Sequence, residues 1–184
     1  INLASALSQL GKKILVIDLD PQGNATTGLG LSNMDSSSDT IYGVLNGTRE
    51  ISQVIKKTQC VNLDIITSNV DLSGLEVETA DDSKRAFILK TKLASYLNDS
   101  SGLYDYVLID CPPSLSLMTV MALVSSNSLL VPLQTEFFAL EGLTQLMKTI
   151  ERIKVNLNPD LKIRGILLTM YDKRNKLSSQ VEKE

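Results

Sequence analysis

Short aliphatic runs that alternate with segments of helical periodicity constrain the fold of this chain most. Each run is bounded by turn-forming residues, as expected for a buried strand. The predicted strands are residues 13–17, 63–66, 106–109, 128–132 and 163–169. The predicted helices are residues 3–10, 41–45, 51–55, 86–97, 115–125 and 140–155, and residues 18–38 are expected to be mostly loop. This alternation predicts an α/β fold, a mostly parallel sheet flanked by helices.

The composition limits the chemistry that the chain can carry. Its 184 residues fit a single α/β domain over residues 1–184, and its 43% apolar and 21% charged content is ordinary for a soluble protein. The net charge of −3 gives no overall attraction for nucleic acid. The sequence contains no histidine, which excludes histidine acid–base chemistry and histidine metal ligands. Catalysis must therefore use carboxylates, lysines, hydroxyls, backbone amides or a bound metal.

Other features indicate a cytoplasmic protein without membrane segments. Cys60 and Cys111 are too few for a disulfide framework or a four-thiolate metal site, and we interpret both as small apolar residues of a reducing compartment. No apolar run approaches the ~18 residues that span a bilayer, and no signal peptide is visible. The chain begins and ends inside helix-like runs, at Ile1 and Glu184, so we expect the fold to be incomplete at both ends.

Acidic residues and prolines follow two of the predicted strands directly. The first strand leads into Asp18-Leu-Asp-Pro-Gln22, and the third leads into Asp110-Cys-Pro-Pro113. Ligands of open parallel sheets bind at the carboxyl ends of strands, where such loops emerge. Mg²⁺ prefers oxygen ligands and is often held by one or two carboxylates together with substrate phosphates. The two loops therefore predict a magnesium–phosphate site, although Asp18 alone could equally be a carboxylate that caps its own loop.

Other short motifs do not support a binding site. Gly28-Leu-Gly30 begins like a dinucleotide fingerprint, but position 33 is asparagine, so we interpret it as a loop. Gly11-Lys-Lys13 lacks the Gly-Lys-Ser/Thr of a phosphate loop. The remaining lysine pairs are scattered and are interpreted as solvated.

Four segments in order resemble the ParA/Soj partitioning ATPases, a deviant Walker group of P-loop NTPases. They are Asp18-Leu-Asp-Pro-Gln-Gly-Asn-Ala-Thr26, Tyr104-Asp-Tyr-Val-Leu-Ile-Asp-Cys-Pro-Pro-Ser114, and residues 131–142 and 165–172. The resemblance spans essentially the whole chain. It implies that ATP and Mg²⁺ are the cofactors. It also implies that a homodimer binds nonspecific DNA on the bacterial nucleoid and is stimulated by a centromere-binding ParB-type partner.

The resemblance also assigns roles to individual residues. Asp20 resembles the residue that orients and activates the hydrolytic water, and Asp110 resembles the Walker B carboxylate that holds magnesium through water. Asp18 would assist in the second shell of the metal. Pro21 and Gln22 would belong to the first nucleotide switch, and Pro112 with Pro113 to the second.

The phosphate loop of the family would precede Ile1-Asn-Leu-Ala4, and this sequence does not contain it. The chain alone is therefore expected neither to bind nor to hydrolyse ATP appreciably. Two alternatives remain open from the sequence. One is a MinD-like or other deviant Walker ATPase, although those branches usually lack Pro-Gln-Gly-Asn after the carboxylates. The other is a regulatory module that kept the fold and lost hydrolysis.

Overall fold

The computed structural model describes residues 1–32, 36–99, 102–114, 116–134, 139–171 and 174. Its backbone contacts group into two compact units, Ile1–Ser125 and Ser126–Glu184, which are described separately. Parts of two family-like segments, residues 135–138 and 172, lie outside the described residues, as does the predicted helix start at residue 115. The prediction of one domain over residues 1–184 stays a prediction.

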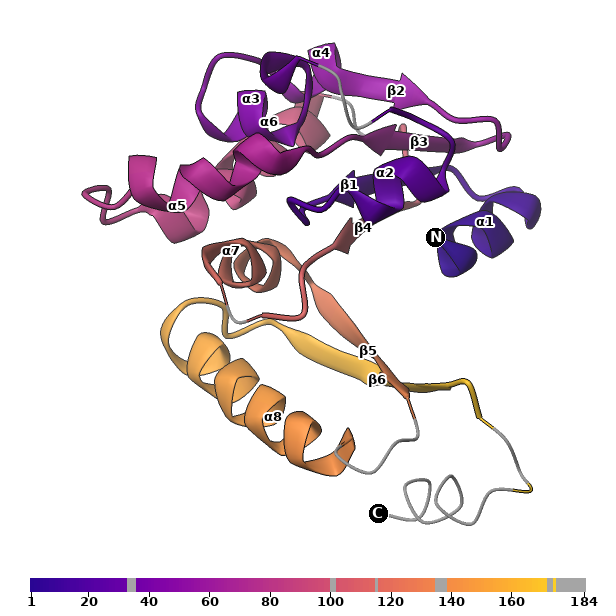
Figure 1. Cartoon of the computed structure of the whole chain (residues 1–184), viewed down its shortest axis with the longest axis vertical. Helices are drawn as coiled ribbons and strands as arrows, with labels where there is room; N and C mark the ends of the chain where they lie inside the picture. The colour runs from indigo at the N-terminus through magenta and orange to yellow at the C-terminus, as the bar shows by residue number, and fades with distance from the viewer. Residues whose placement is uncertain (33–35, 100–101, 115, 135–138, 172–173, 175–184) are drawn as a thin grey trace. The chain divides into compact units, whose positions relative to one another are not determined.

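The first unit is built on a four-stranded sheet with the order β2-β3-β1-β4 (Figure 1). The strands are β1 (Ile14–Asp18), β2 (Ile55–Lys57), β3 (Leu63–Ile66) and β4 (Tyr106–Asp110). β1 pairs in parallel with both β3 and β4, whereas the edge strand β2 runs antiparallel to β3. The predicted α/β class with a mostly parallel sheet is confirmed.

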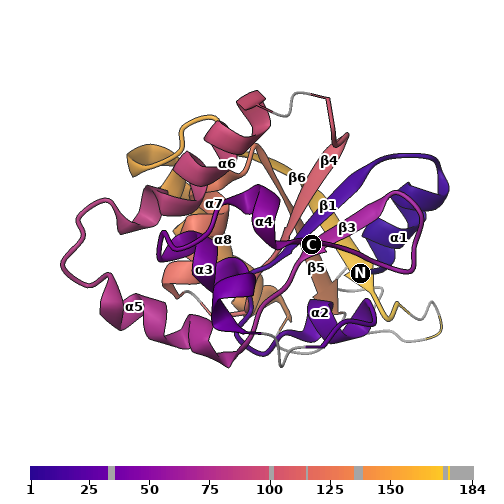
Figure 2. The same ribbon diagram turned by 90° about the horizontal axis from the view of Figure 1, so that it is seen from above.

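Helices of the first unit connect and cover these strands (Figure 2). The α-helices are α1 (Asn2–Gln9), α2 (Asn24–Gly28), α3 (Ile41–Leu45), α4 (Ile51–Val54), α5 (Leu75–Glu78), α6 (Ile88–Asp99) and α7 (Leu117–Ser125). The short 3₁₀ helices are η1 (Ser37–Asp39), η2 (Val70–Gly74) and η3 (Arg85–Phe87).

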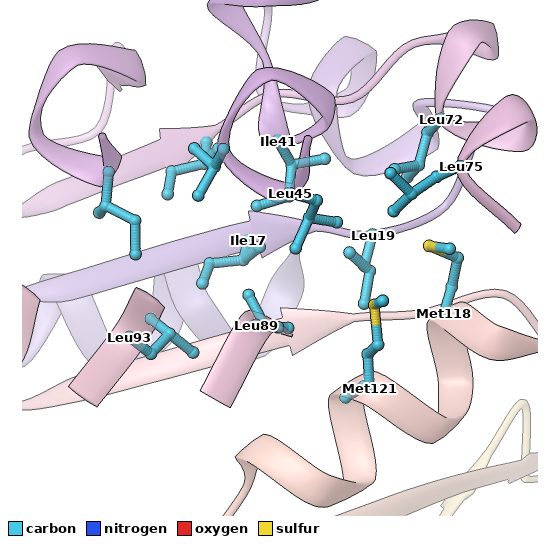
Figure 3. Packing of buried hydrophobic residues seen from close by; sticks show 14 of the residues in the cluster. Ile17, Leu19, Ile41, Leu45, Leu72, Leu75, Leu89, Leu93, Met118 and Met121 are labelled. Atoms are coloured by element: carbon cyan, nitrogen blue, oxygen red, sulfur yellow. The ribbon is translucent and has the colours of Figure 1, made fainter. Parts of the chain in front are cut away.

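The alternation of side chains along β1 gives the sheet two buried faces. Leu15 and Ile17 belong to a large cluster with residues of α3, α4, α6 and α7, part of which Figure 3 shows around Leu19 and Met121. Ile14 and Val16 belong to a smaller cluster with Ala4 of α1 and with residues of β3. Because successive side chains of a strand point to opposite faces, a central strand covered on both sides must be aliphatic throughout. This requirement explains the unbroken Ile-Leu-Val-Ile run.

The second unit is a β–α–β unit. β5 (Ser128–Gln134) and β6 (Lys162–Thr169) pair in parallel, and α8 (Ala139–Asn156) connects them. The side-chain amide of Asn158 donates to the carbonyl of Ser126 at 2.8 Å and ties the end of the connection to the start of β5. β5 continues two residues past Pro132, where the sequence predicted its end, because an edge strand tolerates a residue without an amide donor.

Two local predictions were wrong and one was incomplete. Where the structure describes them, residues 18–38 are mostly loop, as expected, but they also contain the short helix α2. The helix expected over residues 51–55 ends at Val54, and β2 begins at Ile55. A three-residue edge strand carries almost no periodicity, so only its pairing with β3 identifies it. Cys60 is exposed in the β2–β3 connection and is not an apolar filler, whereas Cys111 is partly buried against the large cluster. Among the described helices, none is long and apolar enough to cross a bilayer.

Candidate active site at the ends of β1 and β4

The parallel register of β1 and β4 brings the two acidic loops together. Asp18 and Asp110 are paired residues at the ends of the two strands. Immediately beyond them, the amide of Leu19 donates to the carbonyl of Asp110 at 2.7 Å. The two loops therefore emerge side by side at the carboxyl edge of the sheet.

Asp18 is fully buried, and donors from its own loop surround its carboxylate. Oδ2 accepts from the amide of Thr26 at 2.8 Å and from its hydroxyl at 2.7 Å, and Oδ1 accepts from the amide of Asp20 at 3.2 Å. Burial raises the pKa of Asp18, although the hydrogen bonds from Thr26 lower it in part. Both oxygens are thus engaged by backbone and side-chain donors. The geometry is that of a carboxylate that holds its loop, the alternative considered from the sequence.

The Thr26 hydroxyl also reaches a third loop. Its Oγ1 accepts from the amide of Ser68, which follows β3, at 3.0 Å. Thr26 and Ser68 are both fully buried. Sequence reasoning missed both contacts, because nothing in the spacing shows that Thr26 returns to Asp18 or that Ser68, 42 residues further on, meets it.

Asp20 heads a tight turn. Its Oδ1 accepts from the amide of Gln22 at 3.0 Å, and its carbonyl accepts from the amide of Gly23 at 2.9 Å. Gly23 has a φ of 64°, a left-handed conformation that glycine adopts without steric cost, and α2 begins after it. Asp20 and Pro21 are partly exposed and Gln22 is exposed. Oδ2 of Asp20 accepts no hydrogen bond from the described residues, so it is free to bind a water.

Asp110 is the most exposed residue of the three aspartates. The residue is exposed, and its carboxylate accepts no hydrogen bond within the part of the chain that the structure describes. Partial burial of the carboxyl group, and then the negative charge of Asp18, raise the pKa of Asp110. A cation near Asp110 would relieve this repulsion.

The loop after Asp110 is anchored to α7. The hydroxyl of Thr119 donates to the carbonyl of Ser114 at 2.5 Å and lies 3.2 Å from the carbonyl of Pro112. Pro112 is partly exposed and Pro113 is exposed. Both prolines therefore lie in a loop whose carbonyls accept hydrogen bonds from Thr119 of α7.

The carboxylates at this edge of the sheet suit Mg²⁺ that is bound together with a phosphate ligand. No group of three or more acidic or thiol side chains among the described residues is arranged to enclose a metal ion. Mg²⁺ does not require such a cage, since one or two carboxylates, waters and phosphate oxygens complete its shell. Asp110 has free carboxylate oxygens for this purpose, whereas the oxygens of Asp18 already accept three hydrogen bonds.

A pocket of about 370 Å³ lies at the opposite end of the strands. Lys13, which precedes β1, Asp64 of β3 and Tyr104, which precedes β4, contribute to its lining. Lys57 Nζ and the Tyr104 hydroxyl each lie 2.8 Å from Oδ2 of Asp64. These contacts satisfy the hydrogen-bonding capacity of the buried Asp64 carboxylate within the protein. The pocket lies away from the acidic loops and does not contribute to their chemistry.

Comparisons with known proteins agree with one another. A family model described as an AAA domain matches residues 1–163. The chromosome partitioning protein ParA of Caulobacter vibrioides is 49% identical over 184 residues, which are 100% of this chain and 68% of that protein. The sporulation initiation inhibitor protein Soj of Bacillus subtilis is 42% identical over 100% of this chain and 71% of its own length.

Solved structures show the same fold. A cobyrinic acid a,c-diamide synthase from Mycobacterium smegmatis with bound ADP and magnesium has a TM-score of 0.89 and 36% identity, over 98% of this chain and 71% of that chain. A plasmid partition protein from Borrelia burgdorferi has a TM-score of 0.79 and 26% identity, over 99% of this chain and 76% of that chain. The family model, the curated relatives and these structures lead to one conclusion: this chain belongs to the ParA/Soj-type family of partitioning ATPases.

Proposed function

We propose that this chain carries the water-orienting and magnesium-binding carboxylates of a chromosome-partitioning ATPase. The pairing of Asp18 with Asp110 is the observation that supports this most, since it brings the loops of Asp20 and Asp110 to one edge of the sheet. The curated relatives, at 49% and 42% identity, are named as partitioning proteins or as Soj. They are more similar to this chain than the diamide synthase is, at 36%.

In this proposal each carboxylate has a different task. Asp20, with one oxygen held by the turn and the other free, orients the attacking water and accepts its proton. Asp110 holds Mg²⁺ through water. The bound ion, when present, neutralises negative charge on the nucleotide phosphates. Asp18 supports this arrangement because its carboxylate holds the loop that carries Asp20. We propose that it assists the metal indirectly, through the position of that loop.

The two proline-containing loops are the proposed nucleotide switches. Pro21 and Gln22 lie in the first, and Pro112 and Pro113 in the second, where a γ-phosphate would order them. The exposure of Gln22 and Pro113 leaves both loops accessible to a ligand or to a second subunit. The further steps are what family membership implies, and we propose them for the full-length protein: a nucleotide-dependent homodimer, nonspecific DNA binding on the nucleoid, and stimulation by a ParB-type partner.

An Asp20→Ala variant of the full-length protein tests the proposal. The residue is partly exposed, and within the described part of the chain its carboxylate bonds only in its own turn, so the fold should be retained. We expect ATP turnover to fall at least about 100-fold, the scale on which a positioned acid–base group contributes. ATP affinity should stay within about threefold, since a group that acts in the hydrolytic step alone contributes little to ground-state binding.

Asp81→Ala is the matched control, because Asp81 is an exposed carboxylate in the connection between α5 and α6. Its turnover should equal that of the wild type. Unchanged turnover in Asp20→Ala would refute the role of Asp20. Wild-type protein that binds ATP but does not turn it over, with DNA and a ParB-type partner present, would support the non-hydrolysing module instead.

A further inference from the structure

We infer that Thr26 is a positioning residue for hydrolysis, which joins the loop after β3 to Asp18 and, through Asp18, to the turn of Asp20. This inference rests on the proposed function, because it assigns Thr26 a part in the rate at which Asp20 acts. Its basis is a chain of hydrogen bonds between three loops at the carboxyl edge of the sheet.

The chain of bonds has a fixed direction. The Ser68 amide donates to Thr26 Oγ1 at 3.0 Å, so the hydroxyl proton of Thr26 is available to Asp18 Oδ2, 2.7 Å away. The other oxygen of Asp18 accepts from the Asp20 amide at 3.2 Å. A threonine hydroxyl is suited to this place because it accepts and donates at once. Valine has the same shape and can do neither.

Burial makes the connection rigid. Asp18, Thr26 and Ser68 are all fully buried, so water cannot replace a lost hydrogen bond at this point. Loss of the Thr26 hydroxyl would leave the Ser68 amide without an acceptor and would leave Asp18 Oδ2 with the Thr26 amide as its donor. The Asp18 carboxylate could then rotate, and the Asp20 amide that it holds would move with it. A displacement of about 1 Å in a positioning group can lower a reaction rate by about 100-fold.

The neighbouring Thr27 provides an internal contrast. It lies on the same short helix and is exposed. Among the described residues, its hydroxyl bonds only to carbonyls of that segment, Gly23 at 3.2 Å and Asn24 at 3.3 Å. Thr27→Val therefore makes the same chemical change as Thr26→Val at a place that reaches no other loop.

The test compares Thr26→Val, Thr26→Ser and Thr27→Val in the full-length protein. We expect Thr26→Val to lower the kcat for ATP at least about tenfold, with KM within about threefold, because the change acts on the position of Asp20. Thr26→Ser keeps the hydroxyl and should stay within about threefold of the wild type, and Thr27→Val should match the wild type. If Thr26→Val does not fold, Thr26→Ala removes the hydroxyl without filling the site and replaces it in the comparison.

Amide hydrogen exchange without nucleotide gives a second readout that does not depend on activity. In Thr26→Val, the amides of Asp20 and Ser68 should exchange at least about tenfold faster, while the amide of Leu15 in β1 stays unchanged. Faster exchange with unchanged kcat would overturn the inference, since the contacts would then be structural only. Unchanged exchange would overturn it as well. A wild-type protein without ATP turnover would instead count against the proposed function, and the exchange result would still decide whether the three loops are linked.

Discussion

At the scale of single residues, the three aspartates at the strand ends differ sharply in environment. Asp18 is fully buried and accepts three hydrogen bonds, Asp20 is partly exposed with one oxygen held, and Asp110 is exposed. A buried, fully bonded carboxylate acts on its own loop, whereas an exposed one is available to a cation or a water. The sequence alone does not distinguish the three environments, because each aspartate lies at or just after the end of an aliphatic strand.

The two cysteines provide a prediction at this scale. Burial, and then the charge of Asp110, raise the pKa of Cys111 to about 11, so at pH 8 roughly one Cys111 in a thousand is a thiolate, the reactive form. Cys60 is exposed. Iodoacetamide at pH 8 should therefore modify Cys60 well before Cys111, as measured by peptide mass spectrometry over time.

Raising the pH toward 10 should accelerate modification of Cys111, because each unit below its pKa costs about tenfold in thiolate. Cys60→Ser and Cys111→Ser variants identify which thiol gives each signal. Equal rates for both cysteines in native protein at pH 8 would contradict the environment described for Cys111.

At the scale of elements, one buried side chain connects three strands at the edge of the sheet opposite the acidic loops. Asp64 of β3 pairs with Lys57 of β2 and accepts from Tyr104, which directly precedes β4. β3 and β4 lie on opposite sides of β1, so the Tyr104 hydroxyl connects strands that do not pair directly. Burial and the bond to Asp64 raise the pKa of Tyr104, which keeps its hydroxyl protonated as a donor.

Tyr104→Phe should therefore destabilise the protein. A hydrogen bond to a charged group contributes about 1.5–3 kcal/mol, and its loss leaves Asp64 with Lys57 as its charged partner. Urea unfolding should show a lower midpoint with an unchanged slope. Tyr106→Phe is the matched control, since Tyr106 is exposed at the start of β4, and its midpoint should remain that of the wild type. A Tyr104→Phe midpoint equal to that of Tyr106→Phe would show that the bond contributes nothing.

At the scale of the whole molecule, the chain covers 68% of the length of the Caulobacter ParA and 71% of that of the Bacillus Soj. It carries the acidic loops that follow β1 and β4, and its sequence contains no Gly-Lys-Ser/Thr phosphate loop. Phosphate loops hold nucleotides through backbone amides and a lysine, and carboxylates cannot take over this task because they repel phosphate.

The 184-residue chain by itself should consequently bind Mg-ATP only weakly. Isothermal titration of the isolated chain with Mg-ATP should show no binding at micromolar concentrations. Circular dichroism of the same sample verifies that the chain is folded, so that weak binding is not the result of unfolding. Micromolar affinity in a folded sample would contradict the prediction and would show that the acidic loops grip the nucleotide without a phosphate loop.

The sequence by itself determined the fold class and the place of the acidic loops. Aliphatic runs such as Ile14–Asp18 are long enough and uniform enough to be read as buried strands, and the rule that ligands lie at their carboxyl ends then points to Asp20 and Asp110. Only the tertiary structure showed which donors hold the Asp18 carboxylate and that Thr26 contacts Ser68. Hydrogen bonds between loops depend on which strand ends become neighbours and on the direction in which each donor points. The hydrophobic periodicity of the sequence contains information on neither. The strand β2 was not predicted from the sequence, because its three residues form a strand through their pairing with β3.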